Sequence, residues 1–406
     1  MKKFKLFLYI SLLAIGVFAQ ENDSIQIDEF EDRLAAMPYY SYGKGIGITS
    51  PDSLYQMNIR FRMQNRISFN QYENESDVEA MVRRLRLRFD GFVGDPRFQY
   101  AIQLSFSPED VGEIKDDSDL NIIRDAMFFY VPDKHWQLGF GQTKLPGNRQ
   151  RINSSGALQL TDRSINNSKF NIDRDFGIQI YYLAQKKSGF DFNIKTAIST
   201  GEGRNWLRDF DNGLAYTGRL ELFPMGAFSK GGAFFEGDIA RETQPKLMLS
   251  TGYQFNNNAL RNNGQRGERL YEARDIHSFF ADAIAKYDGW ALMLAYMAKN
   301  TNNHITINPE NPEEKSYIYE GKGYDAQLSY LFRNNYEIIG RFSHQLPNDE
   351  SFMLSPRHNQ MSLGVTKYIW EHTFKIQAEL SKNDYKFFDG SQEDDWYIRF
   401  QVEIGI

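Results

Sequence analysis

The sequence contains no cysteine, and this absence excludes several kinds of chemistry. Disulfides, thiolate catalysis and cysteine-ligated zinc or iron–sulfur centres all require that residue. Only six histidines are present, none of them in an HExxH spacing, and no GxSxG motif occurs. We therefore expect no enzyme, no cofactor and no metal site.

Long apolar runs are also scarce. The run from Leu6 to Phe18 follows Lys2, Lys3 and Lys5 and is followed by the small residue Ala19, which predicts a secretory signal peptide over residues 1–19. This run is shorter than the roughly 20 apolar residues that a membrane-spanning helix needs. Because no second run of spanning length follows, a chain that crosses a membrane must do so with strands.

Positive charge is in deficit. The chain has 47 basic and 53 acidic residues, and removal of the three lysines of the predicted signal leaves 44 basic residues. A nucleic-acid-binding protein would carry the opposite excess, so we expect no nucleic-acid partner. Aromatic residues, in contrast, are abundant, with 32 phenylalanines and 23 tyrosines.

Instead of long apolar runs, the chain contains stretches in which apolar and polar residues alternate. From Tyr55 to Phe69 the odd positions are almost all apolar and the even positions almost all polar. A membrane barrel produces this period of two, because each strand turns one face to lipid and the other to water. The same pattern predicts about sixteen strands, which lie near residues 55–69, 81–93, 98–106, 122–131, 136–140, 176–182, 190–194, 216–222, 247–255, 277–287, 290–298, 324–332, 336–342, 361–367, 374–380 and 396–406.

A large soluble sandwich would alternate too, but its strands are usually five or six residues long. Here the first strand spans about fifteen residues, and short turns such as Asp288-Gly289 alternate with long connections such as Lys299 to Gly321. We predict an all-β fold, a transmembrane antiparallel β-barrel over residues 54–406, preceded by a periplasmic N-terminal extension over residues 20–53. Within this extension, Ser24 to Met37 is either a linker or a short helix.

Two basic regions are candidate sites for anions. The first is an arginine wall on the polar faces of two consecutive strands, formed by Arg60, Arg62, Arg66, Arg84, Arg86 and Arg88. Guanidinium groups keep their charge and fit phosphate or carboxylate with two hydrogen bonds, and basic rings select anions in pores. The alternative is that these arginines only neutralise lumenal carboxylates such as Asp90, Asp125 and Glu221.

The second region is the segment from Gln142 to Arg174, which shows no alternation and has a net positive charge. We expect it to fold into the barrel as a constriction loop; the alternative is a solvated cover outside. Its candidate residues are Lys144, Arg149, Arg151, Arg163, Lys169 and Arg174, and Arg219 is a further candidate lumenal charge.

Several motifs resemble the phosphate-selective porin O/P family, over roughly Gly43 to the C-terminus. They are Gly43-Lys44-Gly45-Ile46 with Ser50-Pro51-Asp52, Arg83-Arg84-Leu85-Arg86-Leu87, Gly141-Gln142-Thr143-Lys144-Leu145-Pro146 with Ser154-Ser155, and Tyr216-Thr217-Gly218-Arg219-Leu220-Glu221 with Pro224. The resemblance implies a homotrimer of sixteen-stranded barrels in the outer membrane of a Gram-negative bacterium, each with an inward-folded loop and a basic passage.

Together, the residues and the resemblance predict a porin for passive diffusion of small anions, with phosphate or polyphosphate as candidate solutes, in contact with outer-membrane lipid and lipopolysaccharide. The alternative is a plugged structural or adhesive barrel whose long loops bind a partner. A continuous water path would favour the porin, and a loop packed across the full bore would favour the alternative.

Overall fold

The computed structural model describes residues 45–111, 122–183, 188–205, 213–265 and 267–406. The predicted signal peptide, most of the predicted extension with its possible helix, and the acidic run 116–119 lie outside the described residues. Among the described residues, no helix is long and apolar enough to cross a membrane.

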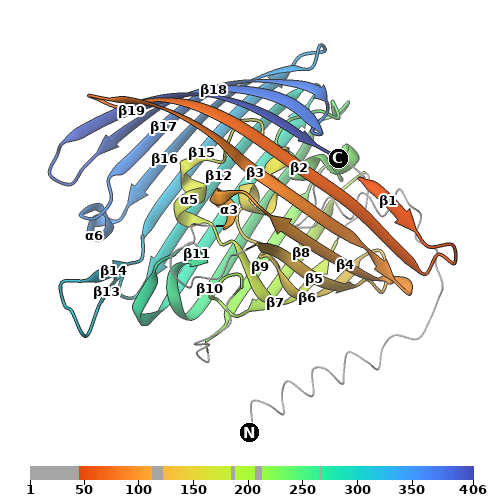
Figure 1. The fold of residues 1–406 in the computed structure, drawn as a ribbon, viewed down its shortest axis with the longest axis horizontal. Helices are drawn as coiled ribbons and strands as arrows, with labels where there is room; N and C mark the ends of the chain where they lie inside the picture. The colour runs from red at the N-terminus through yellow and green to blue at the C-terminus, as the bar shows by residue number, and fades with distance from the viewer. Residues whose placement is uncertain (1–44, 112–121, 184–187, 206–212, 266) are drawn as a thin grey trace, which may run out of the picture.

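All but two of the described strands form one closed antiparallel sheet, drawn from the side in Figure 1. Each strand pairs with its neighbour in sequence, and the last strand pairs with β2 from Trp396↔Gln71 to Gly405↔Arg62. The sheet has seventeen strands, of which the short β1 (Ile46–Thr49) is an addition, so that sixteen close the ring. The sixteen are β2 (Tyr55–Gln71), β3 (Ser76–Val93), β4 (Asp95–Ser105), β5 (Ile123–Tyr130), β6 (Trp136–Lys144), β7 (Arg174–Tyr182), β8 (Asp191–Ser199), β9 (Ala215–Phe223), β10 (Lys246–Gln265), β11 (Arg269–Tyr287), β12 (Trp290–Thr301), β15 (Gly321–Leu331), β16 (Tyr336–Pro347), β17 (Arg357–Trp370), β18 (Phe374–Lys386) and β19 (Gln392–Gly405).

The predicted fold class is confirmed, and each of the sixteen predicted strands corresponds to one strand of the ring. The predicted and observed strands differ mainly in length. Strands β10 and β11, for example, continue beyond the predicted ranges 247–255 and 277–287 as a long hairpin. Strand β1 lies in the range that we assigned to the extension. It pairs Ile46 with Ile59, beyond the point where β19 ends, and so supplies backbone partners to the first residues of β2.

The barrel inverts the usual distribution of side chains. Large apolar residues such as Phe140 and Leu363 are more than half exposed on the outside, whereas polar and charged residues fill the buried inner face. Aromatic pairs lie near both rims: Trp136 with Tyr182 and Trp290 with Tyr330 at one, Phe69 with Trp396 at the other. An apolar band between two aromatic girdles is what a membrane requires of a barrel exterior.

The two ends of the barrel differ. We call the end where β2 finishes and β3 begins the loop end, and the end where β19 finishes the turn end. The loop end carries α3 (Pro108–Val111), the hairpin β13–β14 (Ile305–Ile307 and Lys315–Tyr317) and α6 (Asp349–Phe352). The turn end has tight connections such as Gly94 and Asp288-Gly289.

One connection at the turn end departs from the expected short turns. Residues 224–245, between β9 and β10, contain the 3-10 helix η2 (Ser229–Phe234) and bury Phe228, Phe235 and Glu236. Phe228 packs with Met248 and Ile284, which are buried apolar residues of the barrel strands. This long connection is an exception among the turns at this end, because the segment folds into the lumen and fills space that the wall alone would leave open. We call it the turn-end plug.

Candidate functional site

The arginine wall of β2 and β3 lies on the inner face, as the alternation predicted. Directly opposite residues in the ladder include Arg60 with Arg88 and Arg62 with Arg86. Like charges directly opposite in an antiparallel pair destabilise it, so the wall requires carboxylates close by. The same face of β2 and β3 also carries Arg66 and Arg84, and Arg60, Arg66, Arg84, Arg86 and Arg88 are all less than one-tenth exposed.

A β-bulge adds one arginine that the alternation did not assign to the wall. Gln64 pairs with Arg84 but Asn65 pairs with Val82, so that Arg83 is the extra residue of β3. The bulge turns Arg83 inward beside Arg84 and reverses the phase of the strand, which leaves Val82 exposed. The consecutive arginines Arg83-Arg84 before an alternating run were the available sequence signal for this bulge.

Carboxylates from the wall and from the loops neutralise much of this charge. Asp90 of β3 lies 3.6 Å from Arg60 and 3.0 Å from Arg88. Asp110 of α3 accepts a hydrogen bond of 2.8 Å from Nε of Arg86 and lies 2.9 Å from Arg124. The alternative reading, in which the arginines pair with lumenal acids, therefore applies to a large part of the wall.

Asp162 is the most connected of these acids. It receives hydrogen bonds of 2.7 Å from Arg83 and 3.1 Å from Arg84, and lies 3.5 Å from Arg66. One carboxylate from the segment between β6 and β7 is thus held by three guanidinium groups of the wall. These charge-assisted hydrogen bonds fix that segment against β2 and β3.

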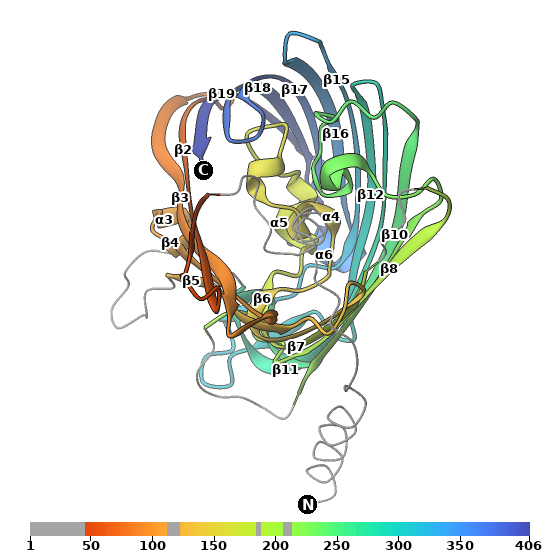
Figure 2. The same cartoon turned by 90° about the vertical axis from the view of Figure 1, so that its right-hand side faces the viewer.

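The segment of residues 145–173 lies inside the ring of strands, where Figure 2 shows α4 (Arg149–Ile152) and α5 (Ile165–Phe170). Its tip rests on the wall, since the hydroxyl of Ser155 accepts hydrogen bonds from Arg62 and Arg86. A Cβ on Gly156 would lie 2.5 Å from Nη1 of Arg62 and 3.0 Å from Oε1 of Glu403, so a larger residue here would displace the ends of these two side chains. On the other side, Thr161 donates to Glu379 of β18 and Ser164 to Asp325 of β15. We call this segment the inner loop.

The loop acids are ionised throughout the ordinary pH range. Burial alone would raise the pKa of Asp162, but Arg83, Arg84 and Arg66 outweigh burial and hold this pKa well below its usual range. The pKa of Asp110 is lowered in the same way, with burial opposed by Arg86 and Arg124, and that of Asp173 by Arg151 and Arg174. A carboxyl whose pKa is depressed by folding stabilises the fold above its unfolded pKa, and loses this contribution only as the pH falls through the depressed value.

We therefore expect the contact of Asp162 with the arginine wall to persist between pH 7 and about pH 4.5, because this carboxylate remains charged above the unfolded aspartate pKa of about 3.9. The step size of single-channel currents and the thermal unfolding temperature should change little over this interval. Both are measured on the purified protein, in planar bilayers and in detergent. A transition centred between pH 4.5 and 6 would contradict this assignment of the anchors.

The predicted loop cations have different surroundings. Lys144 donates to the carbonyl oxygens of Ile152 and Asn153, and Arg149 donates 3.0 Å to the carbonyl oxygen of Phe235 in the turn-end plug. Both are buried structural donors that line neither of the cavities described below. Lys169 lies 5.3 Å above the ring of Tyr319.

Two of the loop cations, Arg151 and Arg163, line the large cavity described below. Arg151 pairs with Asp173, and Arg163 donates to the carbonyl oxygens of Gln150 and Asn153. Arg174, in contrast, is fully engaged by Asp125 and Asp173.

Arg219 lies on the far side of the lumen from the arginine wall. Its guanidinium donates to Glu221, Ser250 and both oxygens of Asp282, and to the carbonyl oxygen of Gly147. All three guanidinium nitrogens of Arg219 therefore donate hydrogen bonds within the protein. Arg219 lines neither the loop-end nor the turn-end cavity described below. Its position connects the barrel wall to the start of the inner loop.

The turn-end plug meets the inner loop in the middle of the barrel. Glu236 of the plug accepts a hydrogen bond from the backbone N–H of Gln159, and Lys286 of β11 donates to the carbonyl oxygens of Gly232 and Gly237. At its far edge the ring of Phe235 stacks at 5.0 Å on His372, which lies between β17 and β18. The two segments together fill the side of the lumen that lies away from the arginine wall.

Two cavities remain beside the wall, one at each end. The loop-end cavity has a volume of about 890 Å³, and its basic lining is Arg83, Arg84, Arg86, Arg124, Arg151, Arg163 and Arg399. The turn-end cavity is about 30 Å³ and is lined by Arg60, Arg62, Arg86 and Arg88 together with Gly156, His372 and Glu403. Arg86 borders both cavities. Sequence reasoning missed Arg83, Arg124 and Arg399.

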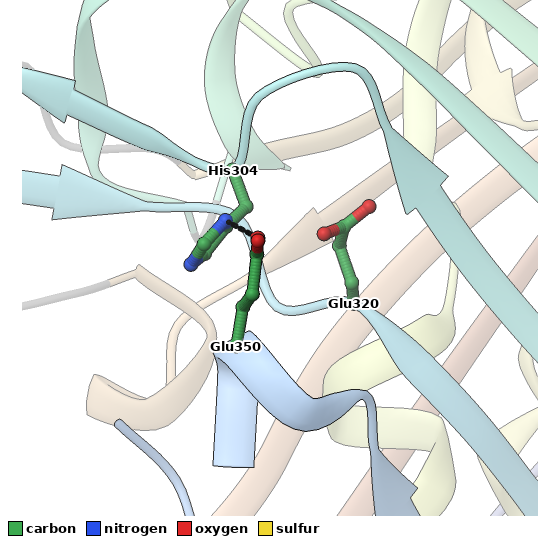
Figure 3. A group of neighbouring side chains, drawn as sticks. All are labelled: His304, Glu320 and Glu350. Carbon is green, nitrogen blue, oxygen red and sulfur yellow. Dashed lines mark ion pairs between the residues drawn. The ribbon is translucent and has the colours of Figure 1, made fainter. Parts of the chain in front are cut away.

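A separate group of possible metal ligands lies at the loop end. His304, Glu320 and Glu350 approach one another from three connections, with ligand atoms within 4.8 Å (Figure 3). Nδ1 of His304 lies 2.9 Å from Glu350, and Glu320 accepts hydrogen bonds from Thr301 and Asn348. These contacts tie β13–β14 to α6, while Nε2 of His304 is buried without a hydrogen-bond partner. No sequence spacing indicates this group, because its members are brought together only by the loops.

A closed barrel of sixteen strands, an apolar exterior between aromatic girdles and a charged inner face with cavities at both ends define a class: this protein is an outer-membrane channel of the porin type. The model of the family "Phosphate-selective porin O and P" matches residues 56–402. The chain therefore belongs to that family, whose members form channels in the outer membrane of Gram-negative bacteria. The comparison with curated protein sequences found no match.

Solved porin structures share the fold. An anion-selective porin from Comamonas acidovorans has a TM-score of 0.55 at 11% identity, over 86% of this chain and 99% of that one. The outer membrane channel DcaP of Acinetobacter baumannii has a TM-score of 0.52 at 12% identity, over 89% and 99%. OprB of Pseudomonas putida has a TM-score of 0.54 at 10% identity, over 86% and 94%.

Proposed function

We propose that this porin carries small anions across the outer membrane by passive diffusion along the arginine wall. The observation that carries the proposal is the position of Arg86, which borders the cavity at each end of the barrel. An anion entering at the loop end would meet Arg83 and Arg84, pass Arg86 beside the inner loop, and leave past Arg60 and Arg88.

The partial neutralisation of the wall fits this mechanism. Asp162, Asp110 and Asp90 each pair with two or more arginines, so no single site presents a bare cluster of guanidinium groups. Binding that is too tight would stop conduction, because an ion must leave each site as readily as it enters. Several weakly positive sites in series give anions a preference over cations without trapping them.

We expect the triple variant Arg84→Ala/Arg86→Ala/Arg88→Ala to lose most of its preference for chloride over potassium. The reversal potential under a potassium chloride gradient, measured on single channels in planar bilayers, should move from the chloride side to near zero. The matched control replaces three exposed arginines, Arg97, Arg269 and Arg333, and should keep the wild-type reversal potential. A cation preference of the wild-type channel would overturn the proposal.

The second candidate function is a plugged barrel whose loops bind a partner. It is favoured by the filled lumen beside β9–β12 and by the small volume at the turn end. The same bilayer experiment separates the two, because a plugged barrel inserts into the membrane without conducting.

We further propose that residues 1–19 are removed on export and that the mature chain assembles as a homotrimer in contact with lipid and lipopolysaccharide. Native mass spectrometry of the protein purified from membranes tests the first two points together. The expected mass is that of three chains that begin at Gln20. A monomer mass, or chains that retain the leader, would contradict the respective point.

A further inference from the structure

The loop-end cavity is larger than an inorganic oxyanion requires. Its volume of about 890 Å³ is in the range of pockets that enclose organic ligands, roughly 300–1,000 Å³. A hydrated phosphate would leave most of this space unused.

The lining of the cavity has two chemically distinct sides. One side is basic and comes from β3, β5 and the inner loop. The other comes from β2, β17, β18 and β19 and presents the amides of Asn70, Gln360 and Asn383 and the carboxylate of Asp395 together with the rings of His358, Tyr385 and Tyr397. Amides donate to and accept from hydroxyl groups, and aromatic rings offer an apolar face with a polar tip.

The amide side is held in one arrangement by its own hydrogen bonds. Asn383 accepts from Gln360 at 3.0 Å and donates to Asp395, and the ring of His358 stacks on Tyr385 at 4.3 Å. Gln360 and Asn383 are both less than one-tenth exposed. Groups oriented in this way before a ligand arrives lose little entropy when it binds.

The two sides meet at Arg399. Its guanidinium lies 3.8 Å from the centre of the Tyr397 ring, and in the described part of the chain no carboxylate forms an ion pair with it. Nε of Arg399 is buried without a hydrogen-bond partner. Arg163 on the basic side likewise has no carboxylate partner among the described ion pairs, although Asp162 and Asp173 are near it. These two arginines are the cations of the cavity most available to an incoming anion.

We infer that the loop-end cavity is a binding site for sugar phosphates, with the phosphate held by arginines and the hydroxyl-bearing ring against the amide and aromatic side. This inference rests on the proposed function and narrows its substrate class. Inorganic phosphate would use only the basic side, and a neutral sugar only the other side.

The test measures block of chloride current by glucose 6-phosphate, inorganic phosphate and glucose, added at the loop end of single channels. The half-blocking concentration of glucose 6-phosphate should be at least tenfold below that of either other probe. In Gln360→Ala/Asn383→Ala the half-blocking concentrations of glucose 6-phosphate and phosphate should become nearly equal. The control is Met361→Ala, which changes the exposed, outward-facing residue next to Gln360 and should keep the wild-type difference.

Calorimetric titration of the detergent-solubilised protein with the same three probes keeps the inference testable if the channel does not conduct. A channel that prefers anions but binds glucose 6-phosphate no better than phosphate would overturn the sugar-phosphate inference and leave the proposed function intact. A channel that does not conduct, or that prefers cations, while binding glucose 6-phosphate would overturn the proposed function alone.

Discussion

Removal of the turn-end plug will raise the conductance of a single channel several-fold. Replacing residues 225–246 with Asn-Gly joins Pro224 to Leu247 in the register already set by Leu222↔Leu249, with the turn that two-residue hairpins favour. The lumen beside β9–β12, which Phe228 and Ala233 now occupy, would then fill with water. Conductance is measured on single channels in planar bilayers.

Two features of the plug determine the design of this experiment. Arg149 and Lys286 donate to backbone carbonyls of the plug and would exchange these partners for water, which leaves two additional cations facing the widened lumen. A second variant therefore also replaces both residues with methionine. The control shortens the exposed tip of the β13–β14 hairpin by removing residues 309–312, and should keep the wild-type conductance. An unchanged conductance in both plug variants would mean that the inner loop alone closes that side.

Neutralising the loop acids will increase the preference for anions. In Asp110→Asn/Asp162→Asn, Arg83, Arg84, Arg86 and Arg124 lose their main counter-charges, while all the guanidinium groups stay in place. One uncompensated charge about 6 Å from a permeating ion is worth on the order of 1 kcal/mol in a partly hydrated pore, or roughly five-fold in relative permeability. The ratio of chloride to potassium permeability, taken from the reversal potential, should rise by about this factor or more.

The matched control removes two acids from the rim of the same cavity, Asp77→Asn/Glu79→Gln. Both residues are exposed, so water screens them and the permeability ratio should change little. Asp162 also anchors the inner loop, so its replacement could move that loop. The single variant Asp110→Asn is therefore measured as well, because Asp110 lies on α3 and not on the inner loop. Equal ratios in the wild type, the double variant and the control would show that the wall arginines do not set selectivity.

Much of the barrel follows from local sequence. The chain has no second long apolar run, and its alternation indicates strands with one face toward water and one toward lipid. This local pattern is enough to place Arg60 and Arg86 on the inner face. The register of long hairpins follows from the short turns between them, as at Asp288-Gly289. Only the bulge at Arg83 interrupts this rule within the wall.

The contents of the lumen do not follow from periodicity. Residues 145–173 and 224–245 have no repeating pattern, and their positions depend on contacts across large distances in sequence, such as Thr161 with Glu379 and Gln159 with Glu236. For this reason the sequence could indicate a basic inner loop but could not separate Arg163, which lines the large cavity, from Arg149, which holds the plug. The long connection after β9 gave no signal that it turns inward.

The sequence by itself determined the fold class, the number of strands, the inner face and the arginine wall, because these depend on a two-residue period and on the cost of leaving backbone groups unpaired in lipid. The tertiary structure alone decided which charges are neutralised, where the lumen is filled and which arginines face open cavities. Electrostatic pairing between segments far apart in the chain is a property of the closed barrel, since only closure brings Asp162 to Arg83 and the plug to the inner loop.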